Sequence, residues 1–356
     1  MYCLSILKTV LAVLLSGVMA SATPARIPGS PATTAAAAVP VKPRVMLSKY
    51  QLESGLIQTF AGGTVADPYF GLYALSLARA GGLDVTHAQA RFIAWGLRDQ
   101  SKDGTFSRYC KKAGVWASCG KSDSDDATLA RWMHLLYSAA PRTAPLPALW
   151  AASAQRAETA LLALRMKSGV YSVFPKDTPG YAGYALFKDN VEVFSVFTQL
   201  SVLFAERGEP ERAAEFARHA TDLREAMKRN FGDKPFAMKR ISLAADYDKW
   251  LFYPHAVSIP FGWLEGYYAP PTVSEWKQWE NSHTQAWLAN AKKDFPWGLM
   301  ALAALKTGNP AVAGCWVQRH RNQSVTGQHW NVLEEVSLQI LVRAKPMPKN
   351  CPVYAP

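Results

Sequence analysis

Apolar residues recur along most of the chain at the three- and four-residue spacing of an α-helix. Patterns typical of β-hairpins are nearly absent. Capping residues, glycines and prolines divide the periodic stretches into separate segments. We expect helices at residues 48–60, 67–80, 84–98, 123–139, 147–166, 188–206, 210–230, 254–267, 272–291, 294–307, 310–321 and 329–343. The pattern therefore predicts an all-α protein.

The predicted helices alternate between two kinds. Segments such as 84–98 and 210–230 are amphipathic and rich in charge, which is typical of helices that face water on one side. Segments such as 67–80 and 188–206 are apolar almost all round, so both of their faces must be buried. An outer ring of the first kind around an inner ring of the second is an (α/α)6 toroid.

In such a toroid the inner helices run parallel, so their N-terminal ends converge at one end of the molecule. Unusually long connections lead into that end, at residues 99–122, 167–187 and 231–253. Long connections in a compact domain usually carry function. We therefore expect a ligand cleft at the N-terminal ends of the inner helices.

The N-terminal region divides into two short segments ahead of the toroid. Residues 1–22 have one lysine, an apolar run too short to span a bilayer and a small-residue cleavage site, which together indicate a signal peptide. Residues 23–44 are rich in Ala, Pro and Thr and are expected to be a flexible linker. Residues 45–356 are predicted to form one toroid domain with a C-terminal tail. The mature protein is expected to be periplasmic or secreted, with no integral membrane segment.

Four cysteines remain after the signal peptide is removed: Cys110, Cys119, Cys315 and Cys351. An even number in an exported protein suggests two disulfides. Of the three possible connectivities, the simplest joins Cys110 to Cys119 and Cys315 to Cys351. No CxxC spacing indicates zinc, and we expect neither a metal nor a cofactor.

The formal net charge of +12 bears on the class of partner. It favours an anionic partner, although secreted proteins are often basic for other reasons. The lysines and arginines are scattered and form no known nucleic-acid motif, so nucleic acid is not expected as a partner.

Carboxylates recur at the starts of the predicted inner helices, most of them with an aromatic residue nearby. Aromatic rings stack on the apolar faces of sugars, while acids bind hydroxyl groups and transfer protons. We expect Asp67, Asp125 and Asp189 to be catalytic, with Asp67 as general acid and Asp125 or Asp189 as its partner. The predicted substrate-binding residues are Tyr69, Asp123, Glu192, Asp248, Trp250 and Trp330.

Helix capping is an alternative explanation for these acids. Aspartate is among the best N-cap residues, and an acid in the first turn interacts favourably with the helix dipole. One cap is enough for one helix, yet Asp123, Asp125 and Asp126 crowd a single turn. Capping therefore explains that turn less well than it explains Asp67.

The segment Ser122-Asp123-Ser124-Asp125-Asp126 resembles the Ser-Asp-Ala-Asp helix start of family 8 glycoside hydrolases, which include bacterial endoglucanases and chitosanases. In that family the aspartates of the motif bind and distort the sugar beside the catalytic acids. The resemblance implies such roles for Asp123 and Asp125, with Asp125 the better match.

The chain departs from this family at its first inner helix. The family has a catalytic glutamate there, followed by Gly-Gln-Ser-Tyr-Gly-Met. This chain has Asp67-Pro68-Tyr69-Phe70-Gly71-Leu72, which keeps an acid and a glycine but lacks the glutamate. The rest of the chain resembles the family only in its expected architecture.

Together these features predict an exported glycoside hydrolase that acts on a polysaccharide, including anionic and amino-sugar polymers. A polysaccharide lyase is a second possibility, because the positive charge suits a uronate polymer and Asn281-Ser282-His283 resembles the Asn-His pair of alginate lyases. Asn281 and His283 are, however, predicted to lie on an outer helix. A third possibility is a polysaccharide-binding toroid without activity.

Overall fold

The computed structural model describes residues 47–179, 183–232, 239–240, 252–284, 287, 295–322 and 329–351. Contacts divide the chain into two units, Met1–Arg44 and Val45–Pro356, and all described residues belong to the second unit. The predicted signal peptide and linker lie outside the described residues.

Eleven α-helices make up most of the described part of the chain. They are α1 (Pro68–Ala80), α2 (Thr86–Asp99), α3 (Asp125–Ala139), α4 (Ala148–Ala163), α5 (Phe187–Glu206), α6 (Pro210–Phe231), α7 (Ser258–Glu265), α8 (Val273–Thr284), α9 (Gly298–Lys306), α10 (Pro310–His320) and α11 (Val332–Ala344). A short π-type helix, η1 (Phe252–Ala256), precedes α7.

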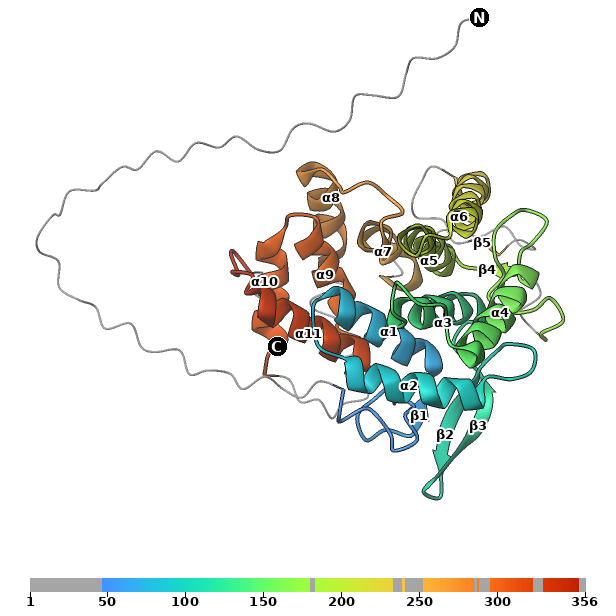
Figure 1. Ribbon diagram of the computed structural model, residues 1–356. Helices are drawn as coiled ribbons and strands as arrows, with labels where there is room; N and C mark the ends of the chain where they lie inside the picture. Colours follow the sequence, from blue (N-terminus) through green and yellow to red (C-terminus); the bar gives the residue numbers. More distant parts are fainter. Residues whose placement is uncertain are drawn as a thin grey trace, which may run out of the picture. The chain divides into compact units, whose positions relative to one another are not determined.

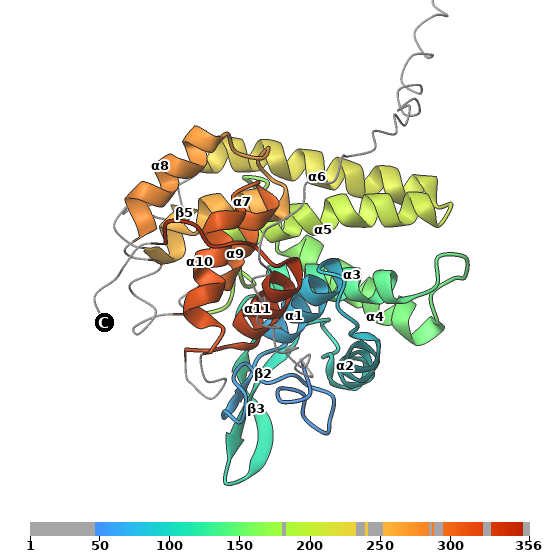
Figure 2. The same cartoon turned by 90° about the vertical axis from the view of Figure 1, so that its left-hand side faces the viewer.

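Six of these helices form a closed ring. Each of α1, α3, α5, α7, α9 and α11 contacts the next, and α11 contacts α1. The helices α2, α4, α6, α8 and α10 lie outside this ring, for example with α6 along α5 and α4 against α3 (Figures 1 and 2). The fold is thus the all-α toroid that the alternation of helices predicted.

Burial distinguishes ring helices from outer helices. Twelve of the fifteen residues of α3 are buried, whereas α2 buries only four of fourteen. A ring helix has neighbours on both sides, while an outer helix covers the ring with one stripe. Gly96 of α2 permits close packing, because a Cβ there would lie 2.5 Å from the ring of Trp132 on α3.

The predicted helix at 48–60 is wrong. This segment forms turns and isolated bridges, between Gln51 and Ile57 and between Phe60 and Asn331. Gly55 has φ of +100°, and a Cβ there would lie 2.3 Å from the carbonyl oxygen of Arg91. Because its backbone has left the helical region to meet α2, the segment cannot continue as a helix. The described part of the toroid therefore has six inner and five outer helices.

A β-hairpin that the sequence pattern did not reveal lies in the connection 99–122. Strands β2 (Ser107–Lys112) and β3 (Val115–Lys121) pair antiparallel, and β1 (Val65–Ala66) joins β2. Its turn, Ala113-Gly114, has positive φ at both residues, a type that usually contains Asn or Asp before Gly. Ala113 therefore gave no turn signal. A shorter pair joins β4 (Tyr184–Ala185) to β5 (Lys239–Arg240).

Two disulfides connect the cysteines in the sequence-local manner. Cys110 pairs with Cys119 across the hairpin, with Cα atoms 5.7 Å apart. Cys315 of α10 pairs with Cys351, with Cα atoms 5.3 Å apart, and so fixes the C-terminal segment. The simplest predicted connectivity is confirmed.

Candidate active site

Acidic side chains from three ring helices meet at one end of the toroid. Asp67 is the N-cap of α1, Asp126 lies in the first turn of α3, and Asp189 lies in the first turn of α5. The charge of Asp123 acts on both Asp67 and Asp189, and the charge of Asp189 acts on Asp126. The starts of neighbouring inner helices therefore form one cluster of acids.

Asp67 is both a helix cap and part of an ion pair. One carboxylate oxygen, Oδ1, accepts a hydrogen bond from the backbone N–H of Tyr69 at 3.0 Å. The other, Oδ2, lies 2.7 Å from Nε of Arg108 on β2, and Nη2 of Arg108 lies 3.4 Å from Asp123. Burial raises the pKa of Asp67, while the Arg108 guanidinium acts in the opposite direction. The capping role is therefore real, but it does not account for the paired arginine.

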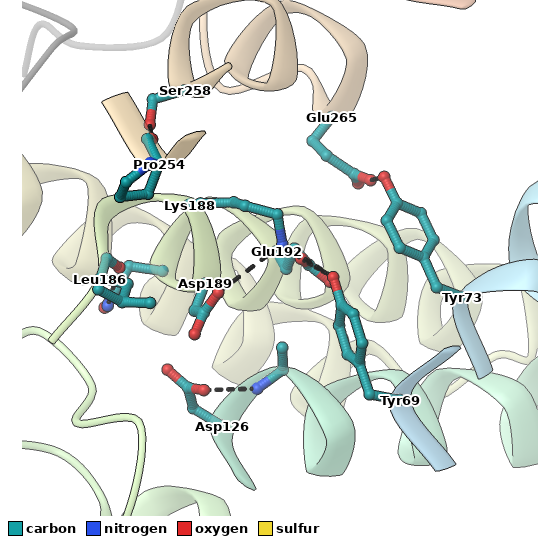
Figure 3. Close-up of polar contacts among 12 residues, drawn as sticks. Tyr69, Tyr73, Asp126, Leu186, Lys188, Asp189, Glu192, Pro254, Ser258 and Glu265 are labelled. Carbon is teal, nitrogen blue, oxygen red and sulfur yellow. Dashed lines mark hydrogen bonds and ion pairs between the residues drawn. The ribbon is translucent and has the colours of Figure 1, made fainter. Parts of the chain in front are cut away.

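Asp126 and Asp189 form a buried pair of carboxyl groups. Their side chains point toward one another from α3 and α5 (Figure 3). Oδ2 of Asp126 has no hydrogen-bond partner among the described residues. Burial, followed by the charge of Asp189, raises the pKa of Asp126 well above its usual range. Burial likewise raises the pKa of Asp189 to about 7, although the Lys188 ammonium lies 3.8 Å away. Two such neighbours retain a proton at pH values where isolated aspartates have lost theirs.

A buried network of charges lies beside this pair. Glu192 accepts hydrogen bonds from the hydroxyl of Tyr69 and from Nζ of Lys188, both at 2.7 Å, and from Arg131 (Figure 3). Burial alone would raise the pKa of Glu192, but the two cations outweigh it and lower the pKa. The structure thus encloses the predicted substrate-binding residues Tyr69 and Glu192 within the ring, where they fix Lys188 beside Asp189.

An aromatic pair lies near the acids. Tyr253, at the start of η1, is 45% exposed and stacks on the half-buried Trp297, with ring centroids 5.2 Å apart and planes at 22°. The charges of Lys188, Asp189 and Asp123 all act on the Tyr253 hydroxyl, so this ring borders the acid cluster. Tyr253 and Trp297 are hereafter called the aromatic platform.

The backbone of the aromatic platform is held by a buried glutamate. Trp297 has φ of +53°, an unusual conformation for a large residue. Its N–H donates to Glu334 of α11 at 3.1 Å, and the N–H of Gly298 donates to the same carboxylate at 2.6 Å. Glu334 thereby caps α9 from a neighbouring helix, where the helix dipole also favours its charge.

Asp125 does not share the environment of Asp126. Successive helical residues point about 100° apart, and Asp125 instead lies 3.6 Å from the ammonium of Lys121. Burial raises the pKa of Asp125 to about 6, with Lys121 opposing the shift. The structure thus sets Asp126, rather than Asp125, against Asp189.

The remaining predicted site residues are not part of this cluster. Asp248 and Trp250 lie outside the described residues. Trp330 is 1% exposed, donates to Glu335 at 3.1 Å and stacks on Trp316. Its side chain is enclosed between α10 and α11.

Several residues of the cluster were not predicted from the sequence as site residues. Asp126 belongs to the crowded acidic turn, but no motif match fell on it. Arg108 is one of 39 basic residues, and nothing in its local pattern distinguishes it. Tyr253 was expected only as a helix-start residue, and core packing explained Trp297 as well as sugar stacking did. The long connections 99–122 and 231–253 indicated where Arg108 and Tyr253 should be sought.

Within the described ranges, no group of three or more His, Cys, Asp or Glu side chains is arranged to hold a metal ion. None of the helices in this part of the chain is long and apolar enough to cross a membrane.

No protein-family model and no curated protein matches the chain. Solved structures do match it. One is described as a novel alpha-amylase from Clostridium perfringens, with a TM-score of 0.54 and 12% identity over 84% of this chain and 95% of that one. Another is the endoglucanase Cel10, a family 8 glycosyl hydrolase from Klebsiella pneumoniae, with a TM-score of 0.44 and 14% identity over 83% of this chain and 96% of that one. The match to the protein described as an alpha-amylase shows that this fold occurs in a solved structure.

Proposed function

We propose that this chain is an exported glycoside hydrolase that cleaves a polysaccharide by means of two carboxyl groups at the N-terminal end of its inner ring. The observation that carries the proposal is the buried Asp126–Asp189 pair at the same end of the inner ring as the Arg108-bound carboxylate of Asp67. Hydrolysis of a glycosidic bond needs one carboxyl group that is protonated and one that is ionised. Burial raises the pKa of each of these carboxyl groups, to about 7 at Asp189, and at Asp67 the Arg108 guanidinium and the Tyr69 N–H counteract the rise.

Asp189 is the proposed general acid. Burial, with the charges of Glu192 and Asp123, raises the pKa of Asp189 to about 7, so that near neutral pH it can donate a proton to the glycosidic oxygen. Asp126 is fully buried and acts through Asp189, as a positioning residue. This assignment reverses the roles expected from the sequence, in which Asp67 was the acid.

Asp67 is the proposed base or nucleophile. A guanidinium 2.7 Å from one oxygen and a backbone N–H on the other both stabilise the ionised form. Each carboxylate oxygen has a further lone pair beyond the contact described, and the proposal assigns one of them to act on water or on the sugar. Asp123, whose side chain is 47% exposed and which shares Arg108, is proposed to bind sugar hydroxyls.

The aromatic platform is the proposed stacking surface for a pyranose ring beside these acids. Tyr253 presents an exposed ring backed by Trp297, and an aromatic face suits the C–H face of a sugar. Asp248 and Trp250 remain predicted subsite residues, and Tyr69 and Glu192 are proposed to act by holding Lys188.

Export and substrate class complete the proposal. The two disulfides favour an oxidising compartment, in agreement with the predicted signal peptide. The net positive charge favours a polymer that is anionic, and the resemblance to chitosanases favours one that contains amino sugars.

Purified protein lacking residues 1–22 should be incubated with a panel of glucans, chitosans and polyuronates, with new reducing ends as the measurement. For the polymer that is cleaved, Asp189→Asn should lower kcat about 100- to 10,000-fold without lowering the melting temperature. The matched control is Glu206→Gln, an exposed acid at the opposite end of the same helix, which should keep full activity.

Other outcomes separate the alternatives. Ultraviolet absorbance from an unsaturated sugar, in place of simple hydrolysis products, would identify a lyase. Binding without any cleavage would identify a polysaccharide-binding toroid. An active Asp189→Asn protein would remove the proposed acid.

A further inference from the structure

A pocket of about 770 Å³ lies between α3, α4 and the segment 164–177. Its lining includes Asp125 and Leu129 of α3, Ala160 of α4, and Ser168 and Phe174 of the segment. The volume falls within the range of small-molecule sites, roughly 300 to 1,000 Å³. The acid pair Asp126–Asp189 does not line it.

Unsatisfied polar atoms and apolar surface occur together in this pocket. Oδ2 of Asp125 is buried and has the Lys121 ammonium 3.6 Å away, but it accepts no hydrogen bond among the described residues. The hydroxyl of Ser168 is also buried and has no described hydrogen-bond partner. Buried polar atoms are normally hydrogen-bonded, so these two atoms call for water or ligand partners.

A sugar unit fits this lining. Its hydroxyl groups can donate to the Asp125 carboxylate and pair with the Ser168 hydroxyl, while its C–H face can lie on Leu129 and Phe174. The lining also has charged side chains of both signs, which can bind further hydroxyl groups of a sugar: Asp103, Arg165, Lys167, Lys176 and Asp177.

The pocket and the acid pair meet at the first turn of α3. Asp125 and Asp126 are consecutive residues in the first turn of α3, and one lines the pocket while the other points toward Asp189. A chain that crosses this turn would therefore have one sugar at Asp189 and another beside Asp125.

We propose that this pocket is a distal sugar-binding subsite, in which Asp125 and Ser168 hold a unit of the polysaccharide remote from the cleaved bond. The inference rests on the proposed glycosidase function for its substrate class. It places Asp125 in a subsite away from the cleaved bond, in place of the catalytic role, or of the sugar-distorting role beside the catalytic acids, that was expected from the sequence.

The test measures binding separately from cleavage. Cellohexaose, chitosan hexamer and maltohexaose are titrated into the Asp189→Asn protein by calorimetry, so that no probe is consumed. Adding Ala160→Trp, which fills the pocket, should weaken binding of the preferred probe at least about tenfold. Adding Ala152→Trp, on an exposed position of the same helix, should not change it.

Each result decides the question. Absence of binding by all three probes, or equal affinity with and without Ala160→Trp, overturns the subsite. If Ala160→Trp does not fold, as judged by circular dichroism, Asp125→Asn takes its place and must show the same weakening. Pocket-dependent binding in a wild-type protein that cleaves no polymer would overturn the hydrolase but keep the subsite. Cleavage by a wild-type protein whose binding does not depend on the pocket would overturn the subsite but keep the hydrolase.

Discussion

Replacing Asp189 by asparagine tests whether the acid pair is held at a cost to stability. The pKa of Asp189 in the folded protein is about 7, against an ordinary value of 3.8. Below about pH 4 the group is protonated whether the chain is folded or unfolded, so its titration does not affect stability. Between these values the unfolded chain releases the proton and the folded chain retains it. The wild-type protein therefore loses stability as pH rises from about 4 to 7.

The magnitude follows from the difference between the two pKa values. Each pKa unit corresponds to about 1.4 kcal/mol, so the wild-type protein should lose roughly 4 kcal/mol over this range from the Asp126–Asp189 pair. Asp189→Asn has no proton to release at this position. Relative to wild type, it should therefore become more stable by up to about that amount between pH 4 and 8.

The assay is urea unfolding at several pH values, followed by circular dichroism. The control is Asp222→Asn on α6, whose side chain is 56% exposed and which should show little pH-dependent difference from wild type. Polysaccharide cleavage is measured on the same proteins. If Asp189→Asn and wild type differ by the same free energy at pH 4 and pH 8, the buried pair does not hold a proton and the reasoning is refuted.

Three further outcomes follow from the same contacts. Arg108→Gln removes the cation beside Asp67, so the pKa of Asp67 should rise. The acidic limb of the pH–activity profile should then move to higher pH, and a shift of the basic limb instead would make Asp67 the general acid. Glu334→Gln removes the charged acceptor of the Trp297 and Gly298 N–H groups, and it should lower stability by about 1 to 3 kcal/mol and raise KM more than it lowers kcat. An unchanged KM would argue against the aromatic platform. Cys110→Ser removes the disulfide across the hairpin and should lower the free energy of unfolding in denaturant by about 2 to 3 kcal/mol. If a reductant leaves the unfolding free energy of the wild-type protein unchanged, this disulfide contributes little.

Helix periodicity and the alternation of helix types determined the fold class of this protein. An amphipathic segment such as α2 can bury only one stripe, whereas α3 must be covered on both faces, and a two-ring arrangement satisfies both. The disulfide connectivity also followed from the sequence, because loops between cysteines close in sequence are the easiest to form. Backbone conformation was less readable: Gly55 breaks the expected helix at 48–60, and Ala113 occupies a turn that rarely contains alanine.

The tertiary structure decided which acids face one another. The sequence showed a crowded acidic turn at α3, but the rotation of that helix against α5 sets Asp126 toward Asp189 and leaves Asp125 beside Lys121. A local pattern fixes the spacing of side chains along one helix. It does not fix the rotation of one helix against another, nor which of many arginines reaches a given carboxylate. Packing across the ring decides both the rotation of the helices and the choice of arginine. It thereby also decides which carboxyl groups of the candidate site keep a proton.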